Sequence, residues 1–184
     1  MKIAVMGLGL IGASLAKALK GQAEVIGITR DQNTIARALA EGVIIRGGSE
    51  AALAAGCDMV VITVPVSIIV KAALSVIPHL DQDTVITDAG STKAELVRSL
   101  DKEWPCFVGS HPIAGKENSG YAASEADLFQ GKACIITPGR STRQDCIEKV
   151  HRLWESVGSR VTVMDPEKHD ELMAKISHMP HLLS

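Results

Sequence analysis

A glycine-rich segment near the N-terminus constrains the fold of this chain more than any other feature. Residues 7–12 read Gly-Leu-Gly-Leu-Ile-Gly, directly after the apolar run 2–6 and at the start of residues 10–20, whose apolar positions have helical spacing. A G-x-G-x-x-G pattern in this context is typical of a strand, a tight turn and a helix packed closely on the strand. The segment therefore predicts that the chain begins with the first half of a βαβ unit.

The residues of this turn have separate roles in such a unit. Gly7 permits the tight turn, Gly9 lets a pyrophosphate approach the backbone, and Gly12 allows the helix to pack closely on the strand. The helix begins around Leu10 and Ile11, where free N–H groups and the positive end of the helix dipole favour phosphate. These five residues are therefore predicted to bind a dinucleotide.

Strand-like and helical patterns alternate along the rest of the chain. The predicted strands comprise residues 2–6, 24–28, 59–64, 84–87, 106–109, 133–137 and 160–164. The predicted helices comprise residues 10–20, 33–41, 67–77, 91–100 and 144–157. This alternation predicts an α/β fold over residues 1–165, a Rossmann-type doubly wound and mostly parallel sheet. The first four strands are expected to be parallel, with residues 7–12 at their carboxyl edge. The longest stretch without a regular pattern, residues 110–131, is of a length that usually marks a functional loop.

The composition agrees with a buried parallel sheet and excludes several classes of partner. Hydrophobic residues make up 46% of the 184 residues but aromatic residues only 3%, so the core is mostly aliphatic. A net charge of −2 gives no basic field that would attract nucleic acid or an anionic membrane. We find no run of 18 apolar residues and no signal-peptide pattern, so we expect no membrane span and a cytoplasmic location. Cys106 and Cys134 lie in apolar runs and are expected to be buried, reduced thiols.

The C-terminal segment, residues 166–184, has the pattern of a helix that is still running where the chain stops, with Pro180 placed to kink it. We expect this segment to be the start of a second, helical domain that is truncated here. It carries His178 and His181 three residues apart. No cysteine or carboxylate completes a convincing set of ligands around them, so no metal site is expected.

The end of the second predicted strand contains Thr29, Arg30 and Asp31. Enzymes that use NAD place an acid at this position to bind the 2′-hydroxyl of the adenosine ribose. Here Arg30 can pair with a 2′-phosphate and the Thr29 hydroxyl can hydrogen-bond it. Asp31 lies close by, and a small shift of the turn would present its carboxylate instead. The sequence therefore favours NADP as the cofactor and leaves NAD open.

Two further turns follow predicted strands and are expected at the same edge of the sheet, where ligands of open parallel sheets bind. Thr63, Val64 and Pro65 end the strand 59–64 and are predicted to lie along the cofactor. Ser91 follows the strand 84–87. It could donate to a substrate oxygen near the nicotinamide, or it could be only the N-cap of the next helix.

His111 follows the strand 106–109 and opens the long loop. A histidine there can take a hydroxyl proton near neutral pH, because its unperturbed pKa is close to 6.5. We therefore expect the rate to rise with pH through one ionisation in the histidine range. His79, His151 and His169 do not follow a predicted strand and are not expected to take part.

Several segments together resemble the prephenate/arogenate dehydrogenases over essentially the whole chain. They are GLGLIGASLAKAL (7–19), VITVP (61–65), TDAGSTK (87–93), GSHPIAGKENSG (109–120), LFQGKACIITP (128–138) and ISHMPH (176–181). Many dehydrogenases share the first segment. The combination of DAGS, SHPIAG and SHMPH in this order is much more specific.

The resemblance implies an oxidative decarboxylation of prephenate or arogenate, in which a hydride passes to the nicotinamide of NAD(P) and carbon dioxide leaves. By resemblance, His111 hydrogen-bonds the substrate 4-hydroxyl and accepts its proton, and Ser91 is a second group at that hydroxyl. His178 and His181 lie on the helix that the resemblance places on the substrate side, and Glu117 matches an acidic position near the mouth of the pocket.

The chain departs from the family pattern at its end. Family members continue beyond the ISHMPH-like segment into a helical domain that forms a homodimer and supplies an arginine for a substrate carboxylate. This chain ends at Ser184. Because the family's helical domain forms the dimer, the resemblance implies a homodimer for the full-length protein. We also expect the fragment to bind the dinucleotide without turning over substrate.

Two other functions remain open at this point. A β-hydroxyacid dehydrogenase or imine reductase would use a lysine after the cofactor domain, for which Lys175 is the nearest candidate, but it leaves SHPIAG and SHMPH unexplained. A non-catalytic dinucleotide sensor with the same fold is also possible, since a fold does not fix a function. Mutation of His111 distinguishes a sensor from an enzyme.

Overall fold

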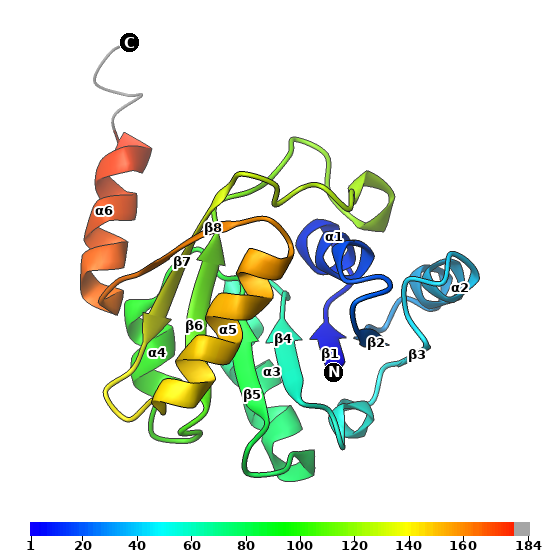
Figure 1. Ribbon diagram of the computed structural model, residues 1–184, viewed down its shortest axis with the longest axis horizontal. Helices are drawn as coiled ribbons and strands as arrows, with labels where there is room; N and C mark the ends of the chain where they lie inside the picture. The colour runs from blue at the N-terminus through cyan, green and yellow to red at the C-terminus, as the bar shows by residue number, and fades with distance from the viewer. Residues whose placement is uncertain (179–184) are drawn as a thin grey trace.

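A single eight-stranded sheet with helices on both faces organises the computed structural model, which describes residues 1–178 (Figure 1). Its strand order is β3-β2-β1-β4-β5-β6-β7-β8. All neighbouring strands are parallel except β6 and β7, which are antiparallel. The strands are β1 Lys2–Met6, β2 Glu24–Ile28, β3 Arg46–Gly48, β4 Met59–Ile62, β5 Val85–Asp88, β6 Phe107–Pro112, β7 Ala133–Pro138 and β8 Arg160–Val163. The helices are α1 Leu10–Ala18, α2 Gln32–Ala40, α3 Ile69–Val76, α4 Ala94–Leu100, α5 Gln144–Ser156 and α6 Pro166–His178.

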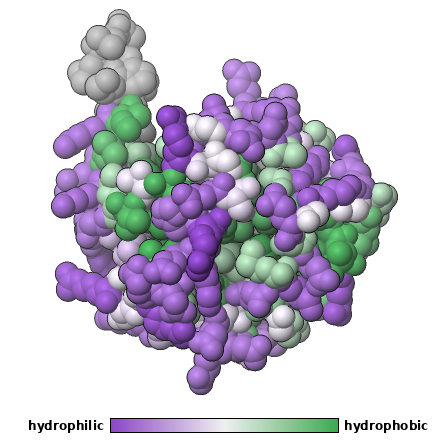
Figure 2. Space-filling view, in the orientation of Figure 1, coloured by the Kyte–Doolittle hydropathy of each residue, from purple (hydrophilic) through white to green (hydrophobic). Residues whose placement is uncertain are grey.

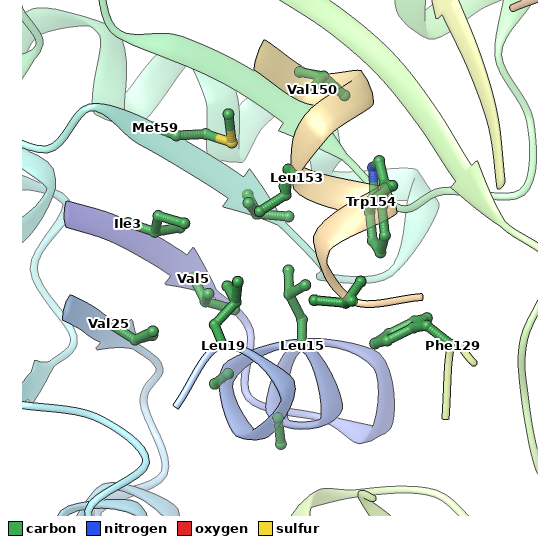
Figure 3. Close-up of a cluster of buried hydrophobic side chains, with 14 of the residues drawn as sticks. Ile3, Val5, Leu15, Leu19, Val25, Met59, Phe129, Val150, Leu153 and Trp154 are labelled. Atoms are coloured by element: carbon green, nitrogen blue, oxygen red, sulfur yellow. The ribbon is translucent and has the colours of Figure 1, made fainter. Parts of the chain in front are cut away.

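Alternate residues of each central strand face opposite layers of helices. Ile3 and Val5 of β1 belong to a core with α1 and α5, part of which Figure 3 shows. Ala4 and Met6 belong to a second core with α3 and α4. Because successive side chains of a strand point to opposite faces, a continuous aliphatic run buries both faces of the sheet. Each fully buried aliphatic side chain contributes about 1.5–3 kcal/mol, so the aliphatic composition is what holds the three layers together.

The predicted fold class is confirmed, and the structure adds two details to it. Strands β2, β1, β4 and β5 are adjacent and parallel, and residues 7–12 follow the carboxyl end of β1. The short strand β3 has no counterpart in the sequence pattern. Strand β6 runs on to Pro112, so residues 110–112 belong to the sheet and not to the long loop. The reason is that β7 pairs with this extension, placing His111 opposite Ile135.

The expectation of a reduced Cys106 is wrong, because the structure joins Cys106 to Cys146 in a disulfide with 5.5 Å between the Cα atoms. The start of α5 lies beside the start of β6, where the Arg143 N–H donates to the Pro105 carbonyl at 3.1 Å. The spacing of 40 residues between the two cysteines gives no indication of this proximity. Cys134 is a buried free thiol, as expected, and burial raises its pKa.

Helix α6 packs beside α4 at one side of the molecule (Figure 1), with Arg98 of α4 3.5 Å from the Glu167 carboxylate. Two apolar side chains of α6, Leu172 and Ile176, are 37% and 55% exposed. Figure 2 shows green side chains along this helix, on a surface that is otherwise mostly polar in this view. Within residues 1–178, every helix is too short or too polar to span a lipid bilayer.

Candidate functional site

The glycine-rich turn joins β1 to α1 and depends on each of its glycines in a different way. Gly7 has φ +99°, a region that side chains rarely adopt. A Cβ at Gly12 would lie 2.0 Å from the Gly7 carbonyl oxygen and 2.3 Å from the Thr63 hydroxyl. A Cβ at Gly9 would meet no protein atom within 4 Å. Gly7 and Gly12 are therefore needed by the fold itself, whereas Gly9 leaves an open space beside the backbone.

The N-terminus of α1 opens onto that space. Gly9 is its N-cap residue, and no side chain caps the helix. The first N–H groups of a helix have no partner within the helix, so those around Leu10 and Ile11 remain available to an anion. An open cradle with uncapped donors fits the diphosphate of a dinucleotide.

Thr63 has a supporting role in this turn that the sequence did not indicate. Its hydroxyl donates to the Gly7 carbonyl at 2.5 Å, and its N–H donates to the Met6 carbonyl at 2.8 Å. The side chain thereby joins the end of β4 to the end of β1. Val64 is half-buried against the same turn, and Pro65 is exposed beside it, so all three residues lie at the edge predicted for the cofactor.

The position predicted to read the ribose lies at the end of β2, and there the Asp31 carboxylate already accepts hydrogen bonds. Asp31 is the N-cap of α2, where it accepts from the N–H groups of Asn33 at 3.0 Å and Thr34 at 3.3 Å. The Thr34 hydroxyl, at 2.7 Å, and these backbone donors lower the pKa of Asp31. Arg30 is exposed next to it. The geometry leaves a cation, and not a free acid, at the end of this strand.

A buried ion pair holds the turn after β5. Asp88 and Lys93 are both fully buried, and the Lys93 ammonium contacts the Asp88 carboxylate. Lys93 also donates to the Ser110 carbonyl at 2.8 Å, while Asp88 accepts from the Ser110 N–H at 3.1 Å. Burial lowers the pKa of Lys93, and the Asp88 charge opposes that shift. The pair thereby ties the turn after β5 to the end of β6, next to His111.

Ser91 is exposed in this turn and does not cap the next helix. The N-cap of α4 is Lys93, and the cap acceptor is Asp170 of α6, which accepts from the N–H groups of Lys93 at 2.8 Å and Ala94 at 2.9 Å. The interpretation of Ser91 as a simple N-cap is therefore wrong. Ser91 follows the carboxyl end of β5, at the same edge of the sheet where His111 lies near the end of the parallel strand β6.

His111 lies half-buried near the end of β6, and His169 of α6 contacts it. The Nδ1 atom of His111 is 2.9 Å from the Nε2 atom of His169. Burial lowers the pKa of His111 to about 4, with smaller contributions in the same direction from His169 and Lys93 and an opposing one from Asp170. His111 is therefore neutral near pH 7 and able to accept a proton. The sequence pattern places His169 apart from the strand ends, and the structure contradicts this, because α6 packs against α4 and β7 and its first turn brings His169 onto His111.

Two of the remaining predicted residues, Glu117 and His178, lie within the described part of the chain. Glu117 lies exposed in the loop after β6. His178 is the last residue of α6, and His181 lies outside the described residues. Sequence reasoning missed Asp88, Lys93, His169 and Asp170. The first two lie within the TDAGSTK segment, whose charged residues at a strand end could have indicated them, whereas no local pattern indicates His169.

Comparison with known proteins identifies the family. Residues 15–163 match the family model described as "Prephenate dehydrogenase, nucleotide-binding domain". The chain belongs to the prephenate/arogenate dehydrogenase family. Within that family, it is 36% identical to a prephenate dehydrogenase of Bacillus subtilis, over 99% of this chain and 51% of the relative.

Two solved structures of the family superpose closely on the chain. Arogenate dehydrogenase from Synechocystis has a TM-score of 0.94 at 31% identity, covering 98% of this chain and 65% of that one. Prephenate dehydrogenase from A. aeolicus, in complex with hydroxyphenyl propionate and NAD+, has a TM-score of 0.92 at 34% identity, covering 100% and 66%. The chain thus spans between about half and two thirds of these relatives and corresponds to their nucleotide-binding part.

Proposed function

We propose that this protein takes part in the NAD(P)-dependent oxidative decarboxylation of prephenate or arogenate, with His111 as the general base. One observation carries the proposal. A neutral, half-buried histidine lies at the carboxyl end of β6, the same edge of the sheet as the glycine cradle between β1 and α1. The family membership supports this choice over a sensor or a β-hydroxyacid dehydrogenase, for which Lys175, exposed on α6, would be the catalytic lysine.

The chemistry assigns a separate task to each group. A nicotinamide held at the glycine cradle would supply the acceptor for the hydride that leaves the substrate carbon bearing the hydroxyl. His111 accepts the hydroxyl proton as that carbon gains carbonyl character, and Ser91 hydrogen-bonds the same oxygen. Loss of carbon dioxide leaves its bonding electrons in the ring, which becomes aromatic when the oxygen regains a proton. We assign Glu117, His178 and His181 to the substrate side.

We further propose that residues 166–184 begin a helical domain that carries the substrate site and forms a homodimer. The decisive experiment assays the intact protein with prephenate and with arogenate, each with NAD and with NADP, and follows reduced nicotinamide and carbon dioxide together. Production of both with either substrate supports the function. A protein that binds dinucleotide but reduces none with either substrate would contradict the proposed function and leave a sensor or another dehydrogenase.

For the cofactor, we propose that NADP binds more tightly than NAD, because Asp31 caps α2 while Arg30 is exposed at the end of β2. Arg30→Ala is then expected to weaken NADP binding by about 1.5–3 kcal/mol, the scale of a hydrogen bond to a charged group. NAD binding should remain nearly unchanged. Titration of this chain with both dinucleotides measures the difference, and Arg37→Ala, an exposed cation paired with Glu41, is the matched control. Equal losses for NADP and NAD would refute the assignment.

The pH dependence follows from the environment of His111. With the pKa of His111 at about 4, the imidazole is neutral throughout the physiological range, and only below that pKa does it become protonated and unable to accept a proton. In the intact protein, kcat/KM is therefore expected to be level from about pH 5.5 to 8 and to fall as the pH drops toward 4. This replaces the sequence-based expectation of an inflection near 6.5. A profile that still rises through pH 6.5 would contradict the burial of this ring.

A further inference from the structure

The first turn of α6 places a histidine and a carboxylate in line behind His111. His169 is fully buried, and its Nε2 atom is 2.9 Å from Nδ1 of His111. The two rings meet edge to face, with 5.1 Å between their centres and 67° between their planes. On the other side of His169, its Nδ1 atom is 2.7 Å from a carboxylate oxygen of Asp170. The three groups form a continuous hydrogen-bonded chain.

Asp170 determines which atoms donate and which accept in these hydrogen bonds, because an ionised carboxylate only accepts hydrogen bonds. Its oxygens already accept from the N–H groups of Lys93 and Ala94 at the start of α4. Burial alone would raise the pKa of Asp170, but these two donors and the His169 ring hold it below its ordinary value. Asp170 is therefore ionised near pH 7, and Nδ1 of His169 must carry the proton that it donates.

The protonation of His111 follows from that of His169. In its neutral form, an imidazole carries one N–H, so a neutral His169 with that proton on Nδ1 has a free lone pair on Nε2. That lone pair can accept only if Nδ1 of His111 carries its proton. Nε2 of His111 is then left without one.

We propose that His169 and Asp170 are positioning residues that hold His111 in the Nδ1–H tautomer, with the bare Nε2 presented to the substrate hydroxyl. The proposal rests on the proposed role of His111 as the base. A base in the other tautomer would present an N–H to the hydroxyl and could not take its proton.

The surrounding charges favour the same arrangement once His111 has taken up a proton. The charged side chains that act on the pKa of His111 include Lys93, the N-cap residue of α4, and Asp170 of α6, and Lys93 is already paired with Asp88. The His111 cation would keep its Nδ1–H bond to His169, whose other nitrogen donates to the Asp170 anion. Asp170 therefore stabilises the charged base through His169 without itself touching the substrate.

The test measures the tautomer of His111 directly, by ¹⁵N–¹H correlation spectra of the imidazole rings in this chain without substrate. The Nδ1–H form is expected in the wild type. Asp170→Asn should give a mixture of tautomers, because an amide N–H can face His169 and reverse the chain of hydrogen bonds. His169→Gln should retain the Nδ1–H form, since its amide can offer oxygen to His111 and N–H to Asp170. The matched control is Asp165→Ala, which removes the cap acceptor for the N–H groups of Glu167 and Lys168 in the same helix but leaves the chain of hydrogen bonds intact.

The kinetic readout comes from the intact protein. Asp170→Asn is expected to lower kcat by about 10–100-fold, the scale for losing the partner that orients a histidine, with little change in KM. His169→Gln should recover most of the rate relative to His169→Ala. The proposal is overturned if His111 is an Nε2–H tautomer in the wild type, or if Asp165→Ala changes the tautomer as much as Asp170→Asn. Because the spectra need no turnover, a protein with the expected tautomer but no dehydrogenase activity would refute the proposed function and leave the positioning intact.

Discussion

Replacement of His111 by Asn is expected to lower kcat of the intact protein by about 10²–10⁴-fold, the range for removing a general acid–base residue. The asparagine amide can still hydrogen-bond the substrate hydroxyl, but it cannot accept a proton. Cofactor affinity should barely change, because the glycine cradle follows β1, whereas His111 lies on β6. Steady-state kinetics and a dinucleotide titration measure the two effects separately.

His79→Asn is the matched control for this substitution. His79 is exposed at the end of a short helical turn after α3 and lies outside the hydrogen-bonded chain of His111, His169 and Asp170. The same change of side chain there should leave kcat and its pH profile as they are. If His111→Asn keeps a near-normal kcat and the wild-type pH profile, His111 is not the base, and His181 becomes the next candidate.

The central strands of the sheet could be predicted from the sequence because they are short, mainly aliphatic runs. Runs such as Met59–Ile62 are aliphatic at every position, and only a strand covered on both faces buries all of them. Strand β3, Arg46–Gly48, escaped prediction because it has two glycines and one exposed arginine. Its place in the sheet comes from pairing with β2, which no local pattern reports.

The site was predictable to the extent that its residues follow strands. The common edge of the sheet at which His111 and the glycine cradle lie could be predicted, because the carboxyl ends of parallel strands meet there. His169 was set aside, since a histidine among charged residues at the start of a helix has the pattern of a solvent-exposed position. It is buried because Asp170, its neighbour, caps α4 and so brings His169, in the first turn of α6, onto His111. That contact joins residues 58 positions apart, which periodicity cannot reveal.

Two substitutions in the glycine cradle are expected to separate stability from binding, because Gly12→Ala should lower stability and Gly9→Ala should weaken dinucleotide binding. Gly12→Ala would place its Cβ against the Gly7 carbonyl and the Thr63 hydroxyl, at 2.0 and 2.3 Å. The Gly7 contact cannot be relieved without moving the backbone of the turn, and rotating the Thr63 hydroxyl away would break its hydrogen bond to Gly7. We expect a loss of about 1–3 kcal/mol or more in the free energy of unfolding, the scale of overpacking in a core. Thermal and urea unfolding of this chain measure it.

Gly9→Ala is expected to leave stability nearly unchanged and to weaken dinucleotide binding. Gly9 has φ −76° and ψ −160°, which alanine can adopt, and its Cβ would meet no protein atom within 4 Å. The new methyl group would instead occupy the space through which the pyrophosphate approaches the backbone. If this steric overlap weakens the free energy of binding by about 1–3 kcal/mol, the scale of overpacking, the dissociation constant for NADP should rise by roughly 5–150-fold. A Gly9→Ala chain that binds NADP as tightly as the wild type would place the phosphates elsewhere. A Gly12→Ala chain of unchanged stability would show that α1 can move away from β1 at little cost.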